Sequence, residues 1–489
     1  LLVPELIARR VILQMFPLHE QRILNQLMTS WVQAVCERQP LDDVCDYFGV
    51  KIAMYFAWLG FYTNSMLYPA VIGFLLWMFA DQDICCVVFA IFNVVWATLF
   101  LERWKRREAE LAYKWGTLDT PAESLEEPRP QFRGVKRHSP VTGCEEFYYP
   151  PWKRRMFRWF VSFPICILCL CFVCLAMFIC LELQVGALTF HNLQLQEFVM
   201  ETKEFPSICR FIPKILLAVT VTVCDEVYKK IALWLNDMEN YRLQSTYDNN
   251  LILKTVFFQF INSYLSLFYI GFYLKDMERL KEMLATLLIF RQFLQNIKEV
   301  LQPYLYEHHK LGALRTLWDL IQTMLLNYSH LIVQRIRLTC QARTLHDYQE
   351  MFIQFGYVVL FSSAFPLAAM CALINNIVEI RSDALKLCSG LQRPFGQRVE
   401  NIGQWQTAME AMGLIAIIVN CYLIGQCGQL QRLFPCTEFN LTLFFHLVSA
   451  FAILLKYVIH VAIPDVPNWV ADEMAKLEYQ RREALKVSQ

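Results

Sequence analysis

Charged residues are scarce in this chain. Asp, Glu, Lys and Arg make up 18% of its 489 residues, whereas soluble domains average about 25%. Hydrophobic residues make up 56%, and they cluster in runs of about 18 residues or more, the length needed to cross a bilayer. The composition therefore excludes an ordinary soluble protein and predicts an all-α polytopic membrane protein.

Signals of several other classes of protein are also missing. The net charge is only +1, which argues against nucleic acid as a partner. The sequence contains no glycine-rich phosphate loop and no HExxH zinc motif, so we expect a protein that is not an enzyme. The first residues, LLVPELIARRVILQMF, are interrupted by charges and do not match a cleavable signal peptide.

Cysteine is the one metal-binding or redox residue that is abundant, with 18 copies. Two CxxC pairs, Cys166/Cys169 and Cys171/Cys174, lie inside the apolar run PICILCLCFVCLAMFIC. A zinc site needs more polar surroundings and longer loops, so we interpret these cysteines as small apolar residues that face lipid. Cys427 and Cys436 flank a loop and are close enough in sequence to pair, and the sequence leaves that question open.

The apolar pattern predicts ten transmembrane spans. They cover residues 51–80, 84–106, 156–183, 209–236, 251–274, 278–303, 347–367, 368–388, 407–430 and 442–463.

Basic residues set the expected orientation of these spans. They gather after the second and eighth spans and in the tail, which places both termini in the cytosol. The domain plan is amphipathic N-terminal helices (1–50), spans one to six (51–303), a cytosolic connection (304–346), spans seven to ten (347–463) and a cytosolic tail (464–489). Asn440, in the sequon NLT, falls on the opposite side and is an expected glycosylation site.

Carboxylates in spans seven and eight are the main candidate site. Glu379 and Asp383 are four residues apart and share one helix face, while Arg381 points to another face. Asp347 and Glu350, three residues apart, share a face of span seven. If the chain turns near Pro366, each leg is about 24 Å long, and the two pairs return to a similar depth.

Span six offers further oxygen ligands near its cytosolic end, namely Gln295, Asn296 and Glu299. A highly anionic site of oxygen ligands is what Ca²⁺ prefers. We therefore predict that Ca²⁺ binds at Asp347, Glu350, Glu379, Asp383 and Glu299, with help from Asn296 or Gln295. The alternatives are solvated acids at helix ends and a proton or cation pathway.

Long motifs in the chain resemble the anoctamin family of calcium-activated chloride channels and lipid scramblases. The similarity is carried by YFGVKIAMYFAWLGFYT, FLERWKRREAELAYKWG, FINSYLSLFYIGFY, QFGYVVLFSSAFPLAAMCALINNIVEIRSDA and HVAIPDVP. Three further stretches, LWLNDMENYRL, LKDMERLKEMLATLL and RPFGQRVENIGQWQ, are most similar to one subgroup of that family.

The resemblance implies a ten-helix homodimer with two Ca²⁺ ions per subunit and a lipid-facing groove formed by spans three to seven. The family pattern in span six is Asn followed four residues later by Glu. Here Val300 stands four residues after Asn296, so Glu299 fits only if Gln295 takes the Asn position or if the helix bulges by one residue. A second family site matches Glu102 and Asp465. His460 replaces a carboxylate there, so we expect weak calcium binding or none.

The resemblance also implies two kinds of transport. We expect a calcium-dependent phospholipid scramblase in the plasma membrane or endoplasmic reticulum; the alternatives are an anion channel that conducts chloride and a membrane-contact or scaffold protein. Chloride-conducting relatives have a basic residue at the position of Gln259, which is neutral here. The candidate groove residues are Thr220, Thr222, Gln259, Asn262, Ser263 and Tyr264, which would either contact headgroups or join helices to one another.

Overall fold

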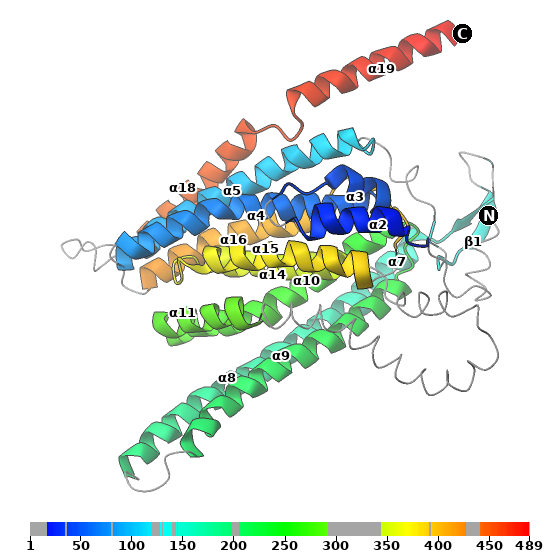
Figure 1. Cartoon of the computed structure of the whole chain (residues 1–489). Coiled ribbons are helices and arrows are strands. Elements are labelled where there is room, and N and C mark those ends of the chain that lie inside the picture. The colour runs from blue at the N-terminus through cyan, green and yellow to red at the C-terminus, as the bar shows by residue number, and fades with distance from the viewer. Residues whose placement is uncertain are drawn as a thin grey trace, which may run out of the picture. The chain divides into compact units, whose positions relative to one another are not determined.

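The computed structural model is almost entirely helical (Figure 1). It describes residues 17–34, 37–79, 82–118, 128–129, 131–138, 143, 145–197, 205–291, 344–390, 393–426 and 441–488. The chain forms two compact units, and their described parts are residues 128–276 for the first unit and residues 17–118 and 277–488 for the second.

The first unit is a bundle of long helices that follows a small hairpin. Its elements are β1 (Val135–His138), β2 (Glu145–Tyr148), α7 (Pro151–Phe157), the π-helix η2 (Arg158–Ser162), α8 (Phe163–Glu197), α9 (Phe205–Met238), α10 (Gln244–Phe268) and the π-helix η3 (Tyr269–Leu274). Helices α8, α9 and α10 pack against one another. Pro151 suits the first turn of α7, where no backbone N–H is needed.

The hairpin departs from the all-α prediction. Strands β1 and β2 pair antiparallel, with Val135 opposite Tyr148 and His138 opposite Glu145. Their sequences, VKRH and EEFY, are mostly charged, and every residue of β1 is exposed. Because such strands lack the apolar alternation of a half-buried strand, the sequence carried no signal for them.

Helix α8 has the expected surface for a helix in contact with lipid. The most apolar window of 18 residues within Pro151–Leu183 has a mean hydropathy of 3.0, and only 22% of that window is buried. Cys171 is exposed on it, and the other three cysteines of the CxxC pairs are half-buried. None of the described cysteines forms a disulfide, and the described residues contain no His, Cys, Asp and Glu group that could hold a metal ion. Cys427 and Cys436 lie outside the described residues.

The second unit contains the remaining helices. They are α2 (Gln21–Leu27), the π-helix η1 (Met28–Val32), α3 (Leu41–Phe48), α4 (Val50–Phe79), α5 (Gln82–Lys114), α11 (Met277–Thr286), the π-helix η4 (Leu287–Arg291), α14 (Thr344–Leu360), α15 (Ala368–Leu385), the π-helix η5 (Lys386–Gly390), α16 (Gln404–Gln426), α18 (Leu441–Ala462) and α19 (Asn468–Ser488). The chain turns between α14 and α15, around Pro366, as the sequence predicts.

Contacts between helices position α14 and α15 in the second unit. Helix α15 packs on α4, α14 packs on α16, and α5 contacts α4, α16 and α18. Buried aromatic side chains fill the spaces between them; Tyr348 packs against Tyr55, Trp58 and Trp405. Gly49, at φ +95° between α3 and α4, has no room for a side chain, since an added Cβ would lie 2.4 Å from Gly396 Cα.

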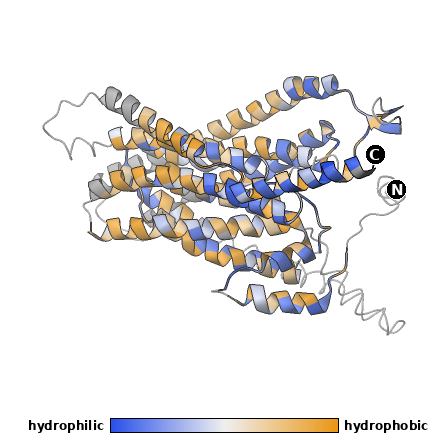
Figure 2. Ribbon diagram, turned by 90° about the horizontal axis from the view of Figure 1, so that it is seen from above, coloured by the Kyte–Doolittle hydropathy of each residue, from blue (hydrophilic) through white to orange (hydrophobic). Residues whose placement is uncertain are grey.

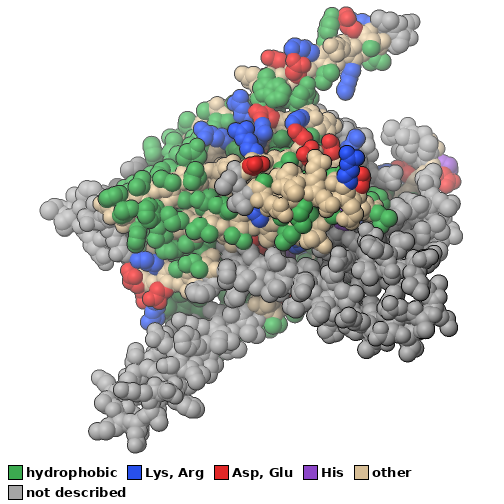
Figure 3. All heavy atoms as spheres, viewed as in Figure 1, with side chains coloured by type: hydrophobic (Ala, Val, Ile, Leu, Met, Phe, Trp, Pro, Cys, Tyr) green, Lys and Arg blue, Asp and Glu red, His purple; other side chains and the backbone are tan. Residues whose placement is uncertain are grey.

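The surface pattern fits a membrane protein. By length and composition, five described segments can cross a membrane: Val50–Phe79, Cys85–Lys114, Pro151–Leu183, Gln244–Leu274 and Gln404–Gly425. Figure 2 shows hydrophobic residues over much of the long helices and hydrophilic residues gathered toward the ends of many of them. In the face drawn in Figure 3, hydrophobic side chains form a broad green area. Exposed hydrophobic residues of α4 and α5 include Leu67, Trp77 and Ile91.

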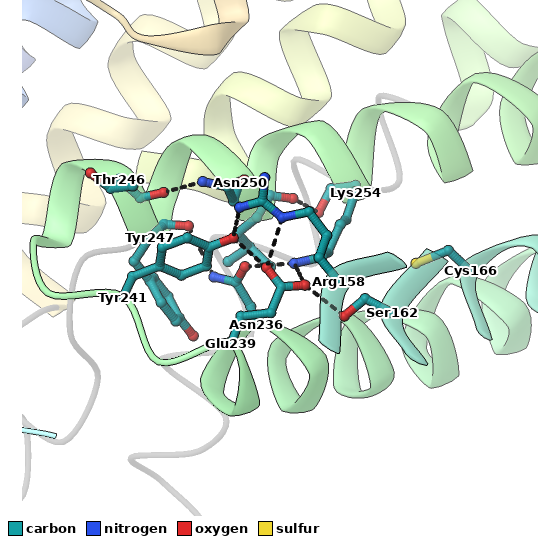
Figure 4. Close-up of polar contacts among 12 residues, drawn as sticks. Arg158, Ser162, Cys166, Asn236, Glu239, Tyr241, Thr246, Tyr247, Asn250 and Lys254 are labelled. Atoms are coloured by element: carbon teal, nitrogen blue, oxygen red, sulfur yellow. Dashed lines mark hydrogen bonds and ion pairs between the residues drawn. The ribbon is translucent and has the colours of Figure 1, made fainter. Parts of the chain in front are cut away.

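A buried carboxylate holds the first unit together where α8, α9 and α10 begin or end (Figure 4). Glu239 follows α9 and is 0% exposed. Its Oε1 accepts hydrogen bonds from Lys254 Nζ at 2.8 Å and Ser162 Oγ at 2.6 Å. Tyr241 donates to its Oε2, and Arg158 Nε lies 3.8 Å from the same oxygen. Burial raises the pKa of Glu239, but the bonds from Lys254, Ser162 and Tyr241 outweigh it, so the pKa lies below the usual value.

We predict that Glu239→Gln destabilises the protein by about 3–5 kcal/mol, because it leaves the Lys254 ammonium without its buried counter-charge. Thermal unfolding of the purified protein measures this. The matched control is Glu145→Gln, which breaks an exposed pair with Lys136 and is expected to cost under about 1 kcal/mol. The pKa of Glu239 is lower in the folded than in the unfolded protein. Its contribution to the free energy of unfolding is therefore fully present above the usual glutamate pKa, and it is lost as the pH falls through the folded pKa. Equal unfolding temperatures for the two variants would contradict this role.

Candidate calcium site between α14 and α15

Helix α15 buries its carboxylate and amide side chains, whereas several of its large apolar side chains are exposed. Glu379 and Asp383 are each 1% exposed, and Asn376 is fully buried. The opposite face carries Ile374, which is 59% exposed, and Val378. This pattern suits a helix whose outer face contacts lipid. It places the carboxylates where water does not solvate their negative charge.

One ammonium group joins α14 to α15. Lys386, the first residue of η5, places Nζ 2.8 Å from Asp383 Oδ1 and 3.3 Å from Asp347 Oδ1. These two aspartates come from the two predicted pairs, so the structure brings the pairs together through their aspartates. Glu350, one helical turn after Asp347, is also buried.

Two further contacts fix the position of α15. Tyr55 of α4 donates a hydrogen bond of 2.6 Å to Asp383 Oδ2. Arg381 points away from the carboxylate face, as the sequence predicts, and donates to the backbone carbonyl of Trp31 in η1. Neither Tyr55 nor Lys386 is predicted from the sequence to belong to the site. Lys386 follows Asp383 by three residues, a spacing that marks it as a neighbour on a helix, whereas Tyr55 carries no local signal.

The donor atoms are of the type that Ca²⁺ takes, namely carboxylate and amide oxygens. They are not gathered into a ready metal centre, since no three His, Cys, Asp or Glu residues of the described parts cluster closely enough to hold an ion. Gln295, Asn296 and Glu299, the predicted ligands from span six, lie outside the described residues.

The second predicted site is already occupied by a cation of the chain itself. Lys105 Nζ lies 3.4 Å from Glu102 Oε2 and 2.9 Å from Glu410 Oε1. His460 Nδ1 lies 3.2 Å from Glu102 Oε1. Asp465 is exposed in the turn after α18. Glu102 therefore has a lysine and a histidine as neighbours, and neither group supplies an anionic oxygen.

Two of the four predicted groove residues of α10 form hydrogen bonds with the neighbouring helix. Gln259, Asn262, Ser263 and Tyr264 are buried. Gln259 donates to Asp225 Oδ1 of α9, Asn262 donates to the carbonyl of Val221 at 3.2 Å, and Ser263 donates to Gln259 Oε1 at 3.3 Å. The contacts of Gln259 and Asn262 join α9 to α10, and that of Ser263 lies within α10.

The α9 candidates differ from those of α10. Thr220 Oγ1 lies 3.6 Å from Cys180 Sγ of α8, whereas Thr222 is exposed. Glu226 and Lys230 continue this exposed face at intervals of four residues, and the Glu226 side chain is 62% exposed. Lys229 pairs with Asp225 at 2.8 Å on the side toward α10.

Comparison with known proteins identifies the family of the chain. The family model described as "Anoctamin: Calcium-activated chloride channel" matches residues 44–477. The chain therefore belongs to the anoctamin family. Anoctamin-8 of Homo sapiens is 47% identical over 99% of this chain, and anoctamin-8 of Mus musculus is 46% identical over 99%. This confirms the subgroup that the three stretches in the sequence indicated.

The chain spans only part of these relatives, 56% of human anoctamin-8 and 65% of the mouse protein. The human alignment runs over 705 positions, more than the 489 residues of this chain, so the relative has inserted residues that this chain lacks. Anoctamin-10 of Homo sapiens is 39% identical over 100% of this chain and 73% of its own length, in an alignment of only 497 positions.

We predict that Glu379→Gln weakens Ca²⁺ binding at least about tenfold, a loss of roughly 1.4 kcal/mol, because it removes one charge from a site that depends on several. Glu350→Gln should act in the same direction. Isothermal titration calorimetry measures both, with Glu282→Gln on α11 as the control, since Glu282 is exposed. Unchanged affinity in both site variants would show that the ligands lie elsewhere.

We predict that Glu102 and Asp465 add no calcium site, because Lys105 already neutralises Glu102. Glu102→Gln should leave the number of bound Ca²⁺ ions unchanged and the affinity within about twofold, under roughly 0.5 kcal/mol. The measurement is the stoichiometry of Ca²⁺ binding by the variant and the wild type. An ordered Ca²⁺ between Glu102 and Asp465 at micromolar calcium would contradict the prediction.

Proposed function

We propose that this protein is a calcium-dependent phospholipid scramblase. We further propose that it is a homodimer with ten transmembrane helices per subunit. It would lie in the plasma membrane or the endoplasmic reticulum, with both termini in the cytosol. The observation that supports it most is the inward-facing set of acids on α14 and α15, since carboxylates are costly inside a membrane unless they serve a function.

The proposed ligands are Asp347, Glu350, Glu379 and Asp383, together with Glu299 and either Gln295 or Asn296. Two Ca²⁺ ions per subunit would supply four positive charges, which nearly balance five carboxylates. The chain's own part is to hold the ligands at one depth: Tyr55 fixes Asp383, and the carbonyl of Trp31 fixes Arg381 on the other side of α15. A change in the charge of this site is thereby passed to α4 and to the N-terminal segment.

The exposed face of α9 is suited to a lipid headgroup. Thr222, Glu226 and Lys230 form a polar row on a long helix. Glu226 Oε1 lies 3.9 Å from Lys229 Nζ, and Lys230 forms no ion pair with any residue in the described ranges. A zwitterionic headgroup carries one charge of each sign, so an exposed acid and an exposed lysine one turn apart match it. Gln259, which is neutral and bound to Asp225, offers no attraction for chloride.

A calcium-activated anion channel is the second candidate, because the matching family model carries that description. A membrane-contact or scaffold role is the third. It is favoured by α7 and η2, where exposed Trp152, Trp159 and Phe160 accompany basic residues and suit contact with an anionic membrane surface.

We predict that the purified protein in liposomes flips fluorescent phospholipid faster with Ca²⁺ than without it, and that chloride efflux rises less. Lys230→Gln should slow flipping about tenfold, because a hydrogen bond to a charged group contributes about 1.5 kcal/mol or more. Lys476→Gln, on the exposed helix α19, is the control and should flip lipid at the wild-type rate.

Three outcomes separate the candidates. Calcium-dependent lipid flipping that Lys230→Gln slows supports the scramblase. Anion-selective, calcium-dependent efflux without lipid flipping would replace it with the channel. Neither lipid flipping nor chloride efflux, in a protein that still binds Ca²⁺, would favour the scaffold role.

A further inference from the structure

Lys386 lies where the candidate calcium ligands converge. Its Nζ is within 3.3 Å of carboxylate oxygens from both α14 and α15. The side chain is 17% exposed, and Asp383 is nearly fully buried. A cation at this position takes up negative charge that a metal ion would otherwise balance.

The position of Lys386 in the chain allows it to move without unfolding α15. It is the residue at which α15 ends and the π-helix η5 (Lys386–Gly390) begins. A lysine has a flexible four-carbon stem and a compact charge. The ammonium can therefore leave the two aspartates by rotation of its side chain, while Tyr55 and Trp31 continue to hold α15.

We propose that Lys386 is a tethered competitor of Ca²⁺, an internal ammonium that occupies the Asp347–Asp383 pair and is displaced when Ca²⁺ binds. This rests on the proposed function, in which these aspartates are calcium ligands. The ammonium is linked to the site by its own backbone, so it competes at a high and constant effective concentration. Lys386 then sets the calcium concentration at which the protein responds, because Ca²⁺ must overcome the ion pairs before it gains its ligands.

The first test is Ca²⁺ binding by calorimetry, with no transport measured. Lys386→Gln removes the competitor and is expected to lower the apparent Kd for Ca²⁺ about tenfold or more. Lys386→Arg keeps the charge and should stay within about threefold of the wild type. Lys476→Gln on α19 is the control for loss of a lysine elsewhere.

The second test uses the wild-type protein, so it does not depend on a variant that folds. An amine-reactive reagent followed by mass spectrometry reports how accessible each lysine is. The reactivity of Lys386 should rise as Ca²⁺ is added. Lys105 is the matched control, because its side chain is 19% exposed, close to the 17% of Lys386, and it is also paired with two carboxylates. Its reactivity should not change.

The outcomes are distinct. The proposal is supported if Lys386→Gln binds Ca²⁺ more tightly than the wild type and labelling of Lys386 rises with Ca²⁺. It is also supported if Lys386→Gln binds Ca²⁺ and the wild type does not. Calcium binding of equal or lower affinity in Lys386→Gln, or constant labelling of Lys386, would overturn the competitor role and leave the calcium site in place. No Ca²⁺ binding by either protein would overturn both the competitor and the proposed calcium dependence.

Discussion

A carboxylate that is buried among membrane helices needs a counter-charge, and in this protein the counter-charge repeatedly comes from a lysine of the same chain. The ion pairs are Lys254 with Glu239, Lys229 with Asp225, Lys105 with Glu102, and Lys386 with both Asp347 and Asp383. These pairs join separate helices or lie one turn apart on one helix. The ion pairs offset the desolvation cost of the buried carboxylates. They also fix the contacts between the helices of each unit.

The pairs differ in what they permit. Glu239 receives bonds from Lys254, Ser162 and Tyr241, and Arg158 lies nearby, so its charge and its hydrogen-bonding positions are satisfied. Such a cluster suits a permanent joint between helices. Asp347 of α14 and Asp383 of α15 share one lysine, Lys386, at a helix end. Several acids with one mobile ammonium form a site whose charge balance an external cation can change, and that is the physical basis of the proposed calcium control.

Much of this arrangement could be predicted from the sequence. The hydrophobic runs predict the long helices, and a turn near Pro366 predicts that α15 returns beside α14. The i, i+3 and i, i+4 spacings predict that each pair of acids shares one helix face. Long motifs gave the family, which the family model confirms. The charged hairpin β1–β2 was missed, because its residues are exposed and do not alternate between apolar and polar. Tyr55 was missed because it comes from a helix 328 positions away in the chain, and only the packing of α4 on α15 brings it to Asp383. The polar residues of α10 could not be assigned, since periodicity does not distinguish a groove from a joint with α9.

The most direct test of the account is a pair of experimental structures in lipid, one with saturating Ca²⁺ and one with a chelator. We predict metal density between α14 and α15, bounded by Asp347, Glu350, Glu379 and Asp383, with the Lys386 ammonium turned away from both aspartates. In the chelated state, Lys386 should bridge Asp347 and Asp383 as it does here. A Lys386 that still bridges the two aspartates at saturating Ca²⁺, with no metal density beside them, would contradict the account.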